Sequence, residues 1–586
     1  MDMSNINSQG TPYNMNEPYS NKLIIIIISV IAFLSIRNLF IYLYNKTKTL
    51  LCLRSLFNIL SPYTSFFGKI ENYVINKFSY RVIHSTICPP LGGILVILVL
   101  ISACLPLLLL NVNLTLNSNR AGFLALAIVP FLLSSTGKNS AIFLLTGISN
   151  SKLNFLHRIL GMALFLCATI HMSCMLSSWS RFPDFMNDQL KIPKVRYGLA
   201  GYVCLCIVML GSWFPIRKYC YELFMVSHLL GIAFIGIIAV HTPYAMRYFI
   251  SGLICYGLNL VAVWFVKTYV AVARFKILPE GCTKVSIRLV SPISKHSIGQ
   301  YVYLSIPAIS LFQWHPFTIT SIHGNEVNTT IEVCICARGN FTRRLYKTID
   351  PSQELRVFVS GPFGSQQIET TQILNSYPSL VIACGGAGIT FGIRLLRELT
   401  ETLLSSDIEE NDSSTGILFN HWKTQNIYFY WSVRRPLEFE WFKEELEQLY
   451  YLYETRHDLP SLCIKFYCTL RDTATVHSTT GRFTNNNTVN ISHIYMNETM
   501  MNDNLITVKE NKEEEENHNH TTTKDYLGKE IEIIQGKRLQ AETILSVDNN
   551  IGAFVCGPTN FNATFRNTVA MKKPSTVYLH CEDFAY

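Results

Sequence analysis

The chain has 586 residues, 49% of them hydrophobic, and a formal charge of +9. This length predicts more than one domain, and the hydrophobic excess lies in roughly the first 270 residues. The basic residues form no stripe with interleaved aromatic side chains, which excludes nucleic acid as a partner. The 17 cysteines include no CxxC pair, so we interpret most of them as small core residues.

Residues 1–21 are polar, and we expect them to form an extracellular N-terminus. The apolar run 23–43 is long enough to span a bilayer and predicts an uncleaved anchor. The loop 44–89 is basic, so the positive-inside rule places it in the cytosol. Further spans are predicted at about 90–112, 122–146, 154–177, 197–215, 222–241 and 247–270.

These seven spans define a predicted membrane domain at 22–272 and deliver the rest of the chain to the cytosol. The predicted span 122–146 is interrupted by Lys138. The sequon at Asn113 falls on the outer side, where it is a candidate glycosylation site.

Four histidines lie inside the apolar runs, His157 and His171 in one run and His228 and His241 in another. An ionisable side chain inside a bilayer is costly and indicates a function. The 14-residue spacing of the first pair puts both rings within about 40° of one helix face, about 21 Å apart. The 13-residue spacing of the second pair is about 140° off one face, so it needs a kink, a π-bulge or two sites that face different ways.

Two helices with two histidines each can hold two planar metal cofactors, and haem is the natural candidate because imidazole is a common axial ligand. Both helices are predicted to run from the cytosolic to the outer face. His157 therefore pairs with His228 on the inner side, and His171 pairs with His241 on the outer side. The alternatives are histidines that only pack within the bundle, and a histidine-relay transporter without haem.

The segment TGISNSKLNFLHRILG, followed by these two histidine pairs, resembles the fungal ferric/cupric reductases, which share a superfamily with the NADPH oxidases. The resemblance implies two stacked b-type haems, each held between the two helices. The HRxxGR pattern of ferric reductases is interrupted here at Met162. An NADPH oxidase that produces superoxide therefore remains the alternative.

After about residue 275 the pattern changes to short alternating runs separated by glycine and proline, which predict an antiparallel β-barrel at 273–372. From about 379 a strand, a glycine loop and a helix are followed by further strands and a helix, which predicts an α/β domain at 373–586. The Asn-rich and Glu-rich stretch 484–526 predicts a disordered insertion. The order of barrel, GPFG and GGxGIT resembles the ferredoxin–NADP reductase superfamily. The expected fold is thus a polytopic α-helical membrane domain with a bis-haem core, followed by a ferredoxin–NADP reductase-like module.

The segment HPFTITS (315–321) resembles the FAD-binding motif of the superfamily. The resemblance implies flavin contacts from His315, Pro316, Phe317, Thr318 and Ser321. The later segment ARGNFTRRL suits a pyrophosphate, because arginine and backbone amides bind phosphate and a glycine permits close approach. The candidate contacts in that segment are Arg338, Gly339 and Thr342.

Two glycine-rich segments precede the predicted nucleotide site, GPFG (361–364) and CGGAGIT (384–390). A glycine turn between a strand and a helix presents amides to phosphates. The candidate cofactor-binding residues there are Gly361, Gly364, Gly385, Gly386, Gly388 and Thr390.

The stretch IYFYWSVRRP resembles the NADP-binding strand of the family, which assigns the 2′-phosphate to Arg434, with Arg435 beside it. Lys537 and Arg538 are further candidate phosphate contacts. The turn FVCGPTNF is expected near the nicotinamide, through Cys556, Gly557 and Pro558. The terminal aromatic of the superfamily stacks over the flavin, a role that falls on Tyr586.

The expected activity is that of an NADPH-dependent ferric-chelate reductase. Electrons from cytosolic NADPH would pass through FAD and two b-type haems to extracellular ferric or cupric chelates. The expected location is the plasma membrane, with an internal membrane such as the vacuole as the alternative. Membrane lipid is an expected partner, and the sequence does not indicate an oligomeric state.

Overall fold

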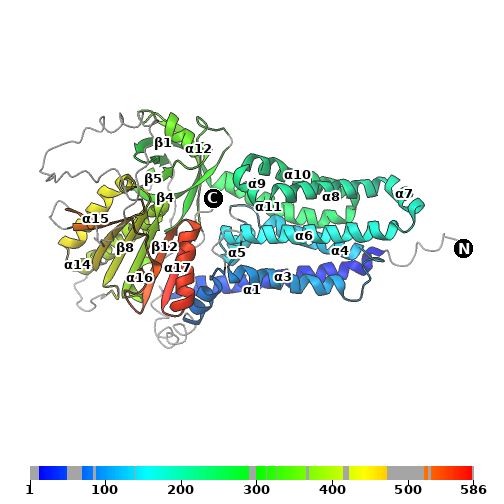
Figure 1. Cartoon of the computed structure of the whole chain (residues 1–586), viewed down its shortest axis with the longest axis horizontal. Coiled ribbons are helices and arrows are strands. Elements are labelled where there is room, and N and C mark those ends of the chain that lie inside the picture. The colour runs from blue at the N-terminus through cyan, green and yellow to red at the C-terminus, as the bar shows by residue number, and fades with distance from the viewer. Residues whose placement is uncertain are drawn as a thin grey trace, which may run out of the picture.

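The computed structural model describes residues 12–48, 69–82, 88–138, 140–289, 298–311, 313–325, 328–364, 369–412, 422–470, 520–524 and 530–583. A helical half and a β-rich half lie end to end along the long axis of the molecule (Figure 1). Tyr586, residues 1–11 and most of the predicted insertion lie outside the described residues.

The helical half consists of membrane-type helices joined by short connections. Six of the described helices are long and apolar enough to cross a membrane, with α11 extended at its start by a 3₁₀ turn. They are α1 (Pro12–Lys48), α3 (Leu91–Leu109), α6 (Asn150–Trp179), α8 (Pro193–Gly211), α10 (Tyr221–His241) and α11 (Met246–Val266). The shorter helices are α4 (Asn119–Ser134), α5 (Ala141–Thr146), α7 (Pro183–Lys191) and α9 (Phe214–Tyr219).

The predicted span 122–146 is not one helix. It consists of α4 and α5, separated by a turn in which Gly137 has a φ of +101° and Lys138 follows. A positive φ ends a right-handed helix, and an ammonium group is disfavoured in a bilayer. The last predicted span also ends early, at Val266, because TYVAVARF alternates as a strand and not as a helix.

The barrel is closed by six strands in the order β1-β2-β5-β4-β3-β6, all paired antiparallel. They are β1 (Thr268–Leu278), β2 (Cys282–Leu289), β3 (Tyr301–Ser305), β4 (His315–Asn325), β5 (Asn328–Cys336) and β6 (Leu355–Phe363). Apolar side chains such as Val285, Ile287 and Val302 alternate inward and fill its core. Helix α12 (Asn340–Thr348) follows β5.

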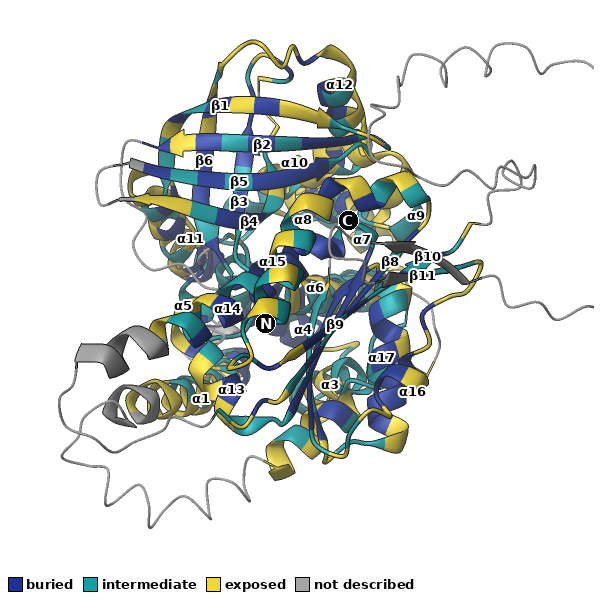
Figure 2. Cartoon of the chain, turned by 90° about the vertical axis from the view of Figure 1, so that its left-hand side faces the viewer, coloured by how far each residue is buried: buried dark blue, intermediate teal, exposed yellow. Residues whose placement is uncertain are grey.

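The α/β domain holds a seven-stranded sheet in the order β10-β11-β9-β8-β7-β12-β13, parallel except for the β10–β11 pair. The strands are β7 (Ser379–Gly385), β8 (Asn426–Val433), β9 (Ser461–Cys468), β10 (His520–Lys524), β11 (Glu530–Gln535), β12 (Ile551–Gly557) and β13 (Val577–Asp583). The helices on the sheet include α14 (Ile389–Asp412), α15 (Lys443–Thr455) and α17 (Thr559–Lys572). Strands β7 and β12 are fully buried, and Figure 2 shows the centre of the sheet in dark blue.

The end of the predicted insertion 484–526 is ordered, since 520–524 form β10 beside β11. The run HTTTK has three consecutive β-branched threonines, which favour a strand. The two halves of the molecule are joined directly, because Lys267 alone separates α11 from β1.

Candidate functional site

The four membrane histidines lie on α6 and α10. The structure brings His157 and His228 together in an edge-to-face arrangement, with ring centroids 6.1 Å apart and ring planes at 61°. Both lie near the starts of their helices, at the end of the bundle that faces the soluble half (Figure 1). His171 and His241 lie towards the opposite ends of the same helices. The two helices therefore run in the same direction.

Three of the four histidines are oriented by a backbone carbonyl of another helix. The Nδ1 atom of His157 lies 3.1 Å from the oxygen of Leu132, that of His171 lies 2.9 Å from Ser118, and that of His241 lies 2.7 Å from Lys194. Nδ1–H donates in each bond, which leaves Nε2 as a lone-pair donor for a metal ion. Leu132 belongs to the last turn of α4, where carbonyls lack intrahelical partners.

The separation of His157 and His228 fits one metal ion between them. An imidazole nitrogen lies about 2 Å from a metal ion that it binds, and the ring centre about 1 Å further, so two opposed ligands have centroids about 6 Å apart. The side chain of His228 is exposed along the bundle, as expected where a cofactor rather than another helix faces the ring. The residues present therefore fit axial ligation of haem.

Small residues let the other histidine pair approach neighbouring helices. A Cβ at Gly198 would lie 2.7 Å from Cε1 of His241, and one at Gly122 would lie 3.4 Å from Nδ1 of His171. By contrast, a Cβ at Gly231 or Gly236 of α10 would meet nothing within 4 Å. Glycine is thus required at 198 by contact with His241.

The predicted flavin motif follows strand β3 and a connecting loop, and it forms the start of strand β4. Thr318 lies opposite Tyr301 of β3, and Pro316 lies opposite Tyr303. His315 stacks on Phe341 of α12 at 4.3 Å, and burial lowers the pKa of the His315 imidazole. A neutral imidazole beside an aromatic ring can donate one hydrogen bond to a phosphate or ribityl group.

The downstream motif forms a compact turn at the start of α12. The hydroxyl oxygen of Thr342 accepts from the amides of Arg338 (2.9 Å) and Gly339 (3.0 Å). The guanidinium of Arg338 lies against Gly386, 3.4 Å from where a Cβ would be. The segment ARGNFTRRL and the glycine-rich loop CGGAGIT, which lie about fifty residues apart in the chain, therefore contact each other.

Ser321 is engaged elsewhere. Its hydroxyl donates to the carboxylate of Glu332 at 2.6 Å, within the barrel. Burial raises the pKa of Glu332, but the Ser321 bond and the nearby Lys284 ammonium outweigh it and lower that pKa overall. Ser321 therefore stabilises the barrel, and we do not assign it to the cofactor.

The turn between α4 and α5 and the first residue of α6 contact the same face of the barrel, which the sequence did not predict. The Lys138 ammonium lies 3.5 Å from the ring centre of Tyr303, and Asn150 donates to the hydroxyl of Tyr301 at 3.3 Å. Burial lowers the pKa of Lys138 to about 8. A lysine in an otherwise apolar run was the only signal of this contact.

The predicted nucleotide loops meet at the carboxyl edge of the parallel sheet, the usual ligand side of such sheets. A Cβ at Gly388 would lie 2.0 Å from the carbonyl oxygen of Cys556. Gly385 also lies close to Pro558, and Gly557 to Gly385. Gly386 has a φ of +54°, and Thr390 caps the turn by donating to the oxygen of Ala387 at 3.0 Å. Close backbone approach therefore explains these glycines.

Gly361 and Gly364 have φ values of +144° and +143°, which exclude other residues without strain. Each lies against β3 or the residue before it, next to Tyr301 and Gln300 respectively. The GPFG segment thus shapes the flavin face of the barrel rather than the nucleotide turn.

The two adjacent arginines after β8 have different surroundings. Arg435 forms an ion pair with Glu280 at 2.9 Å. Arg434 is exposed, and its side chain has no ion pair among the residues that the structure describes. Lys537 and Arg538 are exposed after β11, which ends at the same sheet edge. Arg434 is therefore the arginine better placed to bind a phosphate.

Cys556 is 1% exposed, and burial raises the pKa of its thiol well above the ordinary value. Strand β13 ends at Asp583, with Glu582 beside Gly299 just before β3. The last described residues of the chain therefore lie next to the start of β3.

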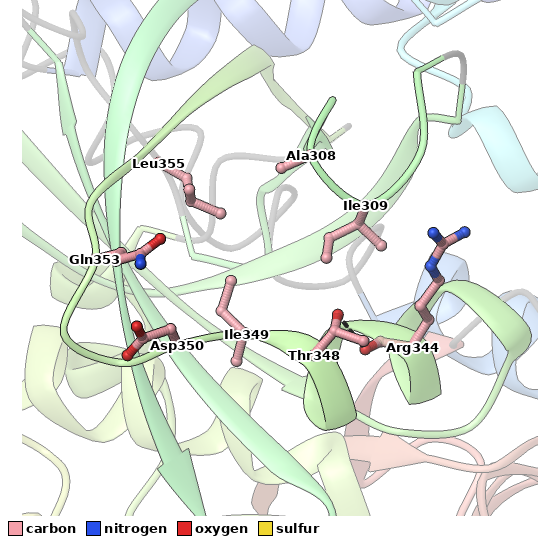
Figure 3. Close-up of a pocket in the computed structure, with 8 residues that line it drawn as sticks. All are labelled: Ala308, Ile309, Arg344, Thr348, Ile349, Asp350, Gln353 and Leu355. Atoms are coloured by element: carbon pink, nitrogen blue, oxygen red, sulfur yellow. Dashed lines mark hydrogen bonds between the residues drawn. The ribbon is translucent and has the colours of Figure 1, made fainter.

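A separate hollow of about 230 Å³ lies on the barrel (Figure 3). Its walls include Ile309, Arg344 and Asp350, of which Arg344 belongs to the segment ARGNFTRRL described above. We assign no ligand to it.

Three family models match the chain. The ferric reductase-like transmembrane component matches residues 121–239, the FAD-binding domain matches 268–367, and the ferric reductase NAD-binding domain matches 377–570. The chain belongs to the ferric reductase/NADPH oxidase superfamily. The membrane component of this superfamily is a haem-binding domain, so the multi-pass half, the barrel and the α/β domain correspond to haem, FAD and nucleotide modules.

Two curated relatives illustrate both branches of the superfamily. The chain is 28% identical to a probable cell surface ferric reductase of Aspergillus oryzae, over 56% of this chain and 44% of that protein. It is 27% identical to a superoxide-generating NADPH oxidase heavy chain of Dictyostelium discoideum, over 51% of this chain and 48% of that protein. The chain thus spans about half the length of these relatives.

Among solved structures, a ferredoxin–NADP⁺ reductase of Neisseria gonorrhoeae with bound FAD and NADP is similar to part of this chain. The match has 12% identity and a TM-score of 0.32, and covers 54% of this chain and 99% of that one.

Proposed function

We propose that this protein is a transmembrane ferric-chelate reductase that takes electrons from cytosolic NADPH and delivers them to extracellular ferric or cupric chelates. The observation that carries the proposal is the opposed pair His157/His228, placed at the end of the bundle that meets the flavin face of the barrel. The Aspergillus relative, a probable cell surface ferric reductase, supports metal as the acceptor and the plasma membrane as the location.

Each half of the chain supplies its own part of this activity. FAD, when bound, would supply the conversion of a two-electron hydride into single electrons, and haem would supply a one-electron carrier. In the soluble half, Phe317 and Thr318 would hold the flavin, Arg338 would hold its pyrophosphate, and Arg434 would bind the 2′-phosphate of NADPH. Tyr586 would cover the flavin until nicotinamide replaces it.

In the membrane half, His157 and His228 would ligate the inner haem, and His171 and His241 the outer one. The carbonyls of Leu132, Ser118 and Lys194 hold three of these rings in the required tautomer. With two histidines assigned to each iron, an extracellular metal chelate would be reduced without becoming a ligand of that iron.

The proposed orientation puts residues 69–82 and the soluble half in the cytosol. Asn113 supports it, because it is exposed in the α3–α4 loop at the end of the bundle that carries His171. Superoxide production is the second candidate, supported by the Dictyostelium relative.

The purified protein tests this proposal by spectroscopy. We expect haem and flavin absorbance at a ratio of two haems to one flavin, and anaerobic NADPH should reduce both. A preparation with intact flavin but no haem absorbance would contradict the proposal and would favour a histidine-relay transporter.

A further inference from the structure

Segment 69–82 joins parts of the protein that lie about 500 residues apart in the chain. Residues 69–78 are helical and precede α3. Asn72 and Asn76 lie four residues apart, so their side chains share a helix face. Both Nδ2 groups donate to the carbonyl of Val577 at 2.9 Å, and Asn76 also donates to Pro574 at 2.9 Å. Asn76 is 1% exposed.

A second contact follows immediately in the chain. The backbone amide of Arg81 donates to Oδ1 of Asn567, and Nδ2 of Asn567 donates back to the carbonyl of Arg81, both at 2.9 Å. Asn567 lies on α17 and is 3% exposed. One side-chain amide thus satisfies both backbone groups of Arg81.

The contacts of Asn72 and Asn76 reach the first residue of an edge strand. Strand β13 is at the edge of the seven-stranded sheet, and an open edge exposes unpaired carbonyl and amide groups. The carboxamides of Asn72 and Asn76 satisfy one such carbonyl, that of Val577. Segment 69–82 therefore contacts the nucleotide domain at the start of its edge strand.

The same segment is tied to the membrane helices on its other side. Glu71 forms an ion pair with Arg37 of α1. The amide of Leu91, the first residue of α3, donates to the carbonyl of Tyr80 at 2.9 Å. Figure 1 shows α17 beside the end of α1, away from the place where α11 enters the barrel.

The soluble half has one covalent connection to the bundle, at Lys267 between α11 and β1. The barrel and the α/β domain share an apolar core, in which Cys282 and Ile298 pack with Phe391. The two soluble domains are therefore packed against each other. The contacts of segment 69–82 add to those of Lys138 with Tyr303 and of Asn150 with Tyr301, and they attach the α/β domain to the membrane half.

We propose that segment 69–82 is a positioning clamp that sets the distance between the flavin face of the barrel and the His157/His228 pair. Asn72, Asn76 and Asn567 are its positioning residues. The inference rests on the proposed function. Losing the clamp lets the soluble half rock about Lys267 without changing the packing of its two domains. NADPH then reduces FAD at the normal rate, whereas transfer from FAD to haem slows.

The test is the variant Asn72→Ala/Asn76→Ala/Asn567→Ala in the full-length holoprotein, reconstituted in lipid nanodiscs. Anaerobic stopped-flow follows flavin and haem absorbance separately after mixing with NADPH. One buried hydrogen bond shifts an equilibrium about tenfold. We therefore expect haem reduction to slow by at least about tenfold, with the rate of flavin reduction unchanged. Hydrogen exchange at residues 577–579 should accelerate by a similar factor.

The matched control is Asn549→Ala, an exposed asparagine of the same domain, which should alter neither rate nor hydrogen exchange. If hydrogen exchange accelerates in the triple variant but the rate of haem reduction does not change, the proposal that segment 69–82 is a positioning clamp is wrong. If the triple variant does not assemble, Asn76→Ala alone should slow haem reduction to a smaller extent and leave the rate of flavin reduction unchanged. Absence of haem reduction in the unmodified protein would instead overturn the proposed function, and the exchange comparison would still test the contacts.

Discussion

The membrane half and the soluble half hold their candidate site residues in different ways. In the membrane half, the site consists of four side chains, three of them oriented by a carbonyl of another helix. In the soluble half, the site consists mainly of backbone, brought together where glycine permits contacts such as Gly388 with the carbonyl of Cys556. A single substitution of a histidine in the membrane half should therefore abolish electron transfer. A single substitution of an exposed side chain in the soluble half, such as Arg434, should only weaken the binding of NADPH.

The largest expected effect comes from removing an outer histidine. In His171→Ala, reduction of an extracellular chelate should fall by more than about 100-fold, because the outer iron loses a ligand. Flavin reduction by NADPH should continue at the normal rate, since the soluble half is untouched. Stopped-flow and intact-cell assays on the same variant measure both. A normal rate of extracellular chelate reduction in His171→Ala would contradict the assignment of His171 as an essential ligand.

The next effect tests whether a glycine matters in the membrane half as well. In Gly198→Ala the new methyl group would lie 2.7 Å from the His241 ring and displace it. We expect about half the haem content, with FAD content unchanged. Gly236→Ala is the matched control, because its methyl group meets nothing within 4 Å. Equal haem content in both variants would contradict the assignment of His241.

A charge at the rim of the soluble half should have a smaller effect. Arg434→Ala should raise the KM for NADPH by about tenfold or more, the strength of a charge-assisted hydrogen bond. The KM for NADH should not change, because NADH lacks the 2′-phosphate. Arg435→Ala, which removes an ion pair with Glu280, should leave both values nearly unchanged. A larger rise of the KM for NADPH in Arg435→Ala than in Arg434→Ala would assign the 2′-phosphate to Arg435 instead.

The smallest effect concerns Lys138, where the two halves meet. Burial lowers its pKa to about 8, below the ordinary lysine value of about 10.4. The unfolded chain therefore binds more protons between these pH values, and the lysine's contribution to stability rises with pH in that window. We expect Lys138→Met to melt at a higher temperature than the unmodified protein at pH 7, with the difference shrinking from pH 8 to pH 10. A difference independent of pH would contradict the burial of the charge.

The sequence predicted the elements whose pattern is local. Ionisable histidines in apolar runs, alternating strands and glycine turns each follow from short-range chemistry, and they located both halves and their order. The close pairing of His157 with His228 also followed, from the predicted direction of the two helices.

Contacts between distant segments could not be predicted in the same way. Lys138 interrupted an apolar run, but only the fold shows that it lies against Tyr303. The bond of Ser321 to Glu332 depends on the pairing of β4 with β5. Nothing local to Asn76 indicates that it meets a strand about 500 residues later. The superfamily resemblance supplied the cofactor roles of Arg338 and Arg434, which neither spacing nor composition implied.

The central claim is that metal, not oxygen, accepts the electrons. Intact cells that express the protein should be given a membrane-impermeant ferric chelate, with and without oxygen. We predict that reduction persists without oxygen and is insensitive to superoxide dismutase. Reduction that requires oxygen and disappears when superoxide dismutase is added would contradict the account and would assign the protein to superoxide production.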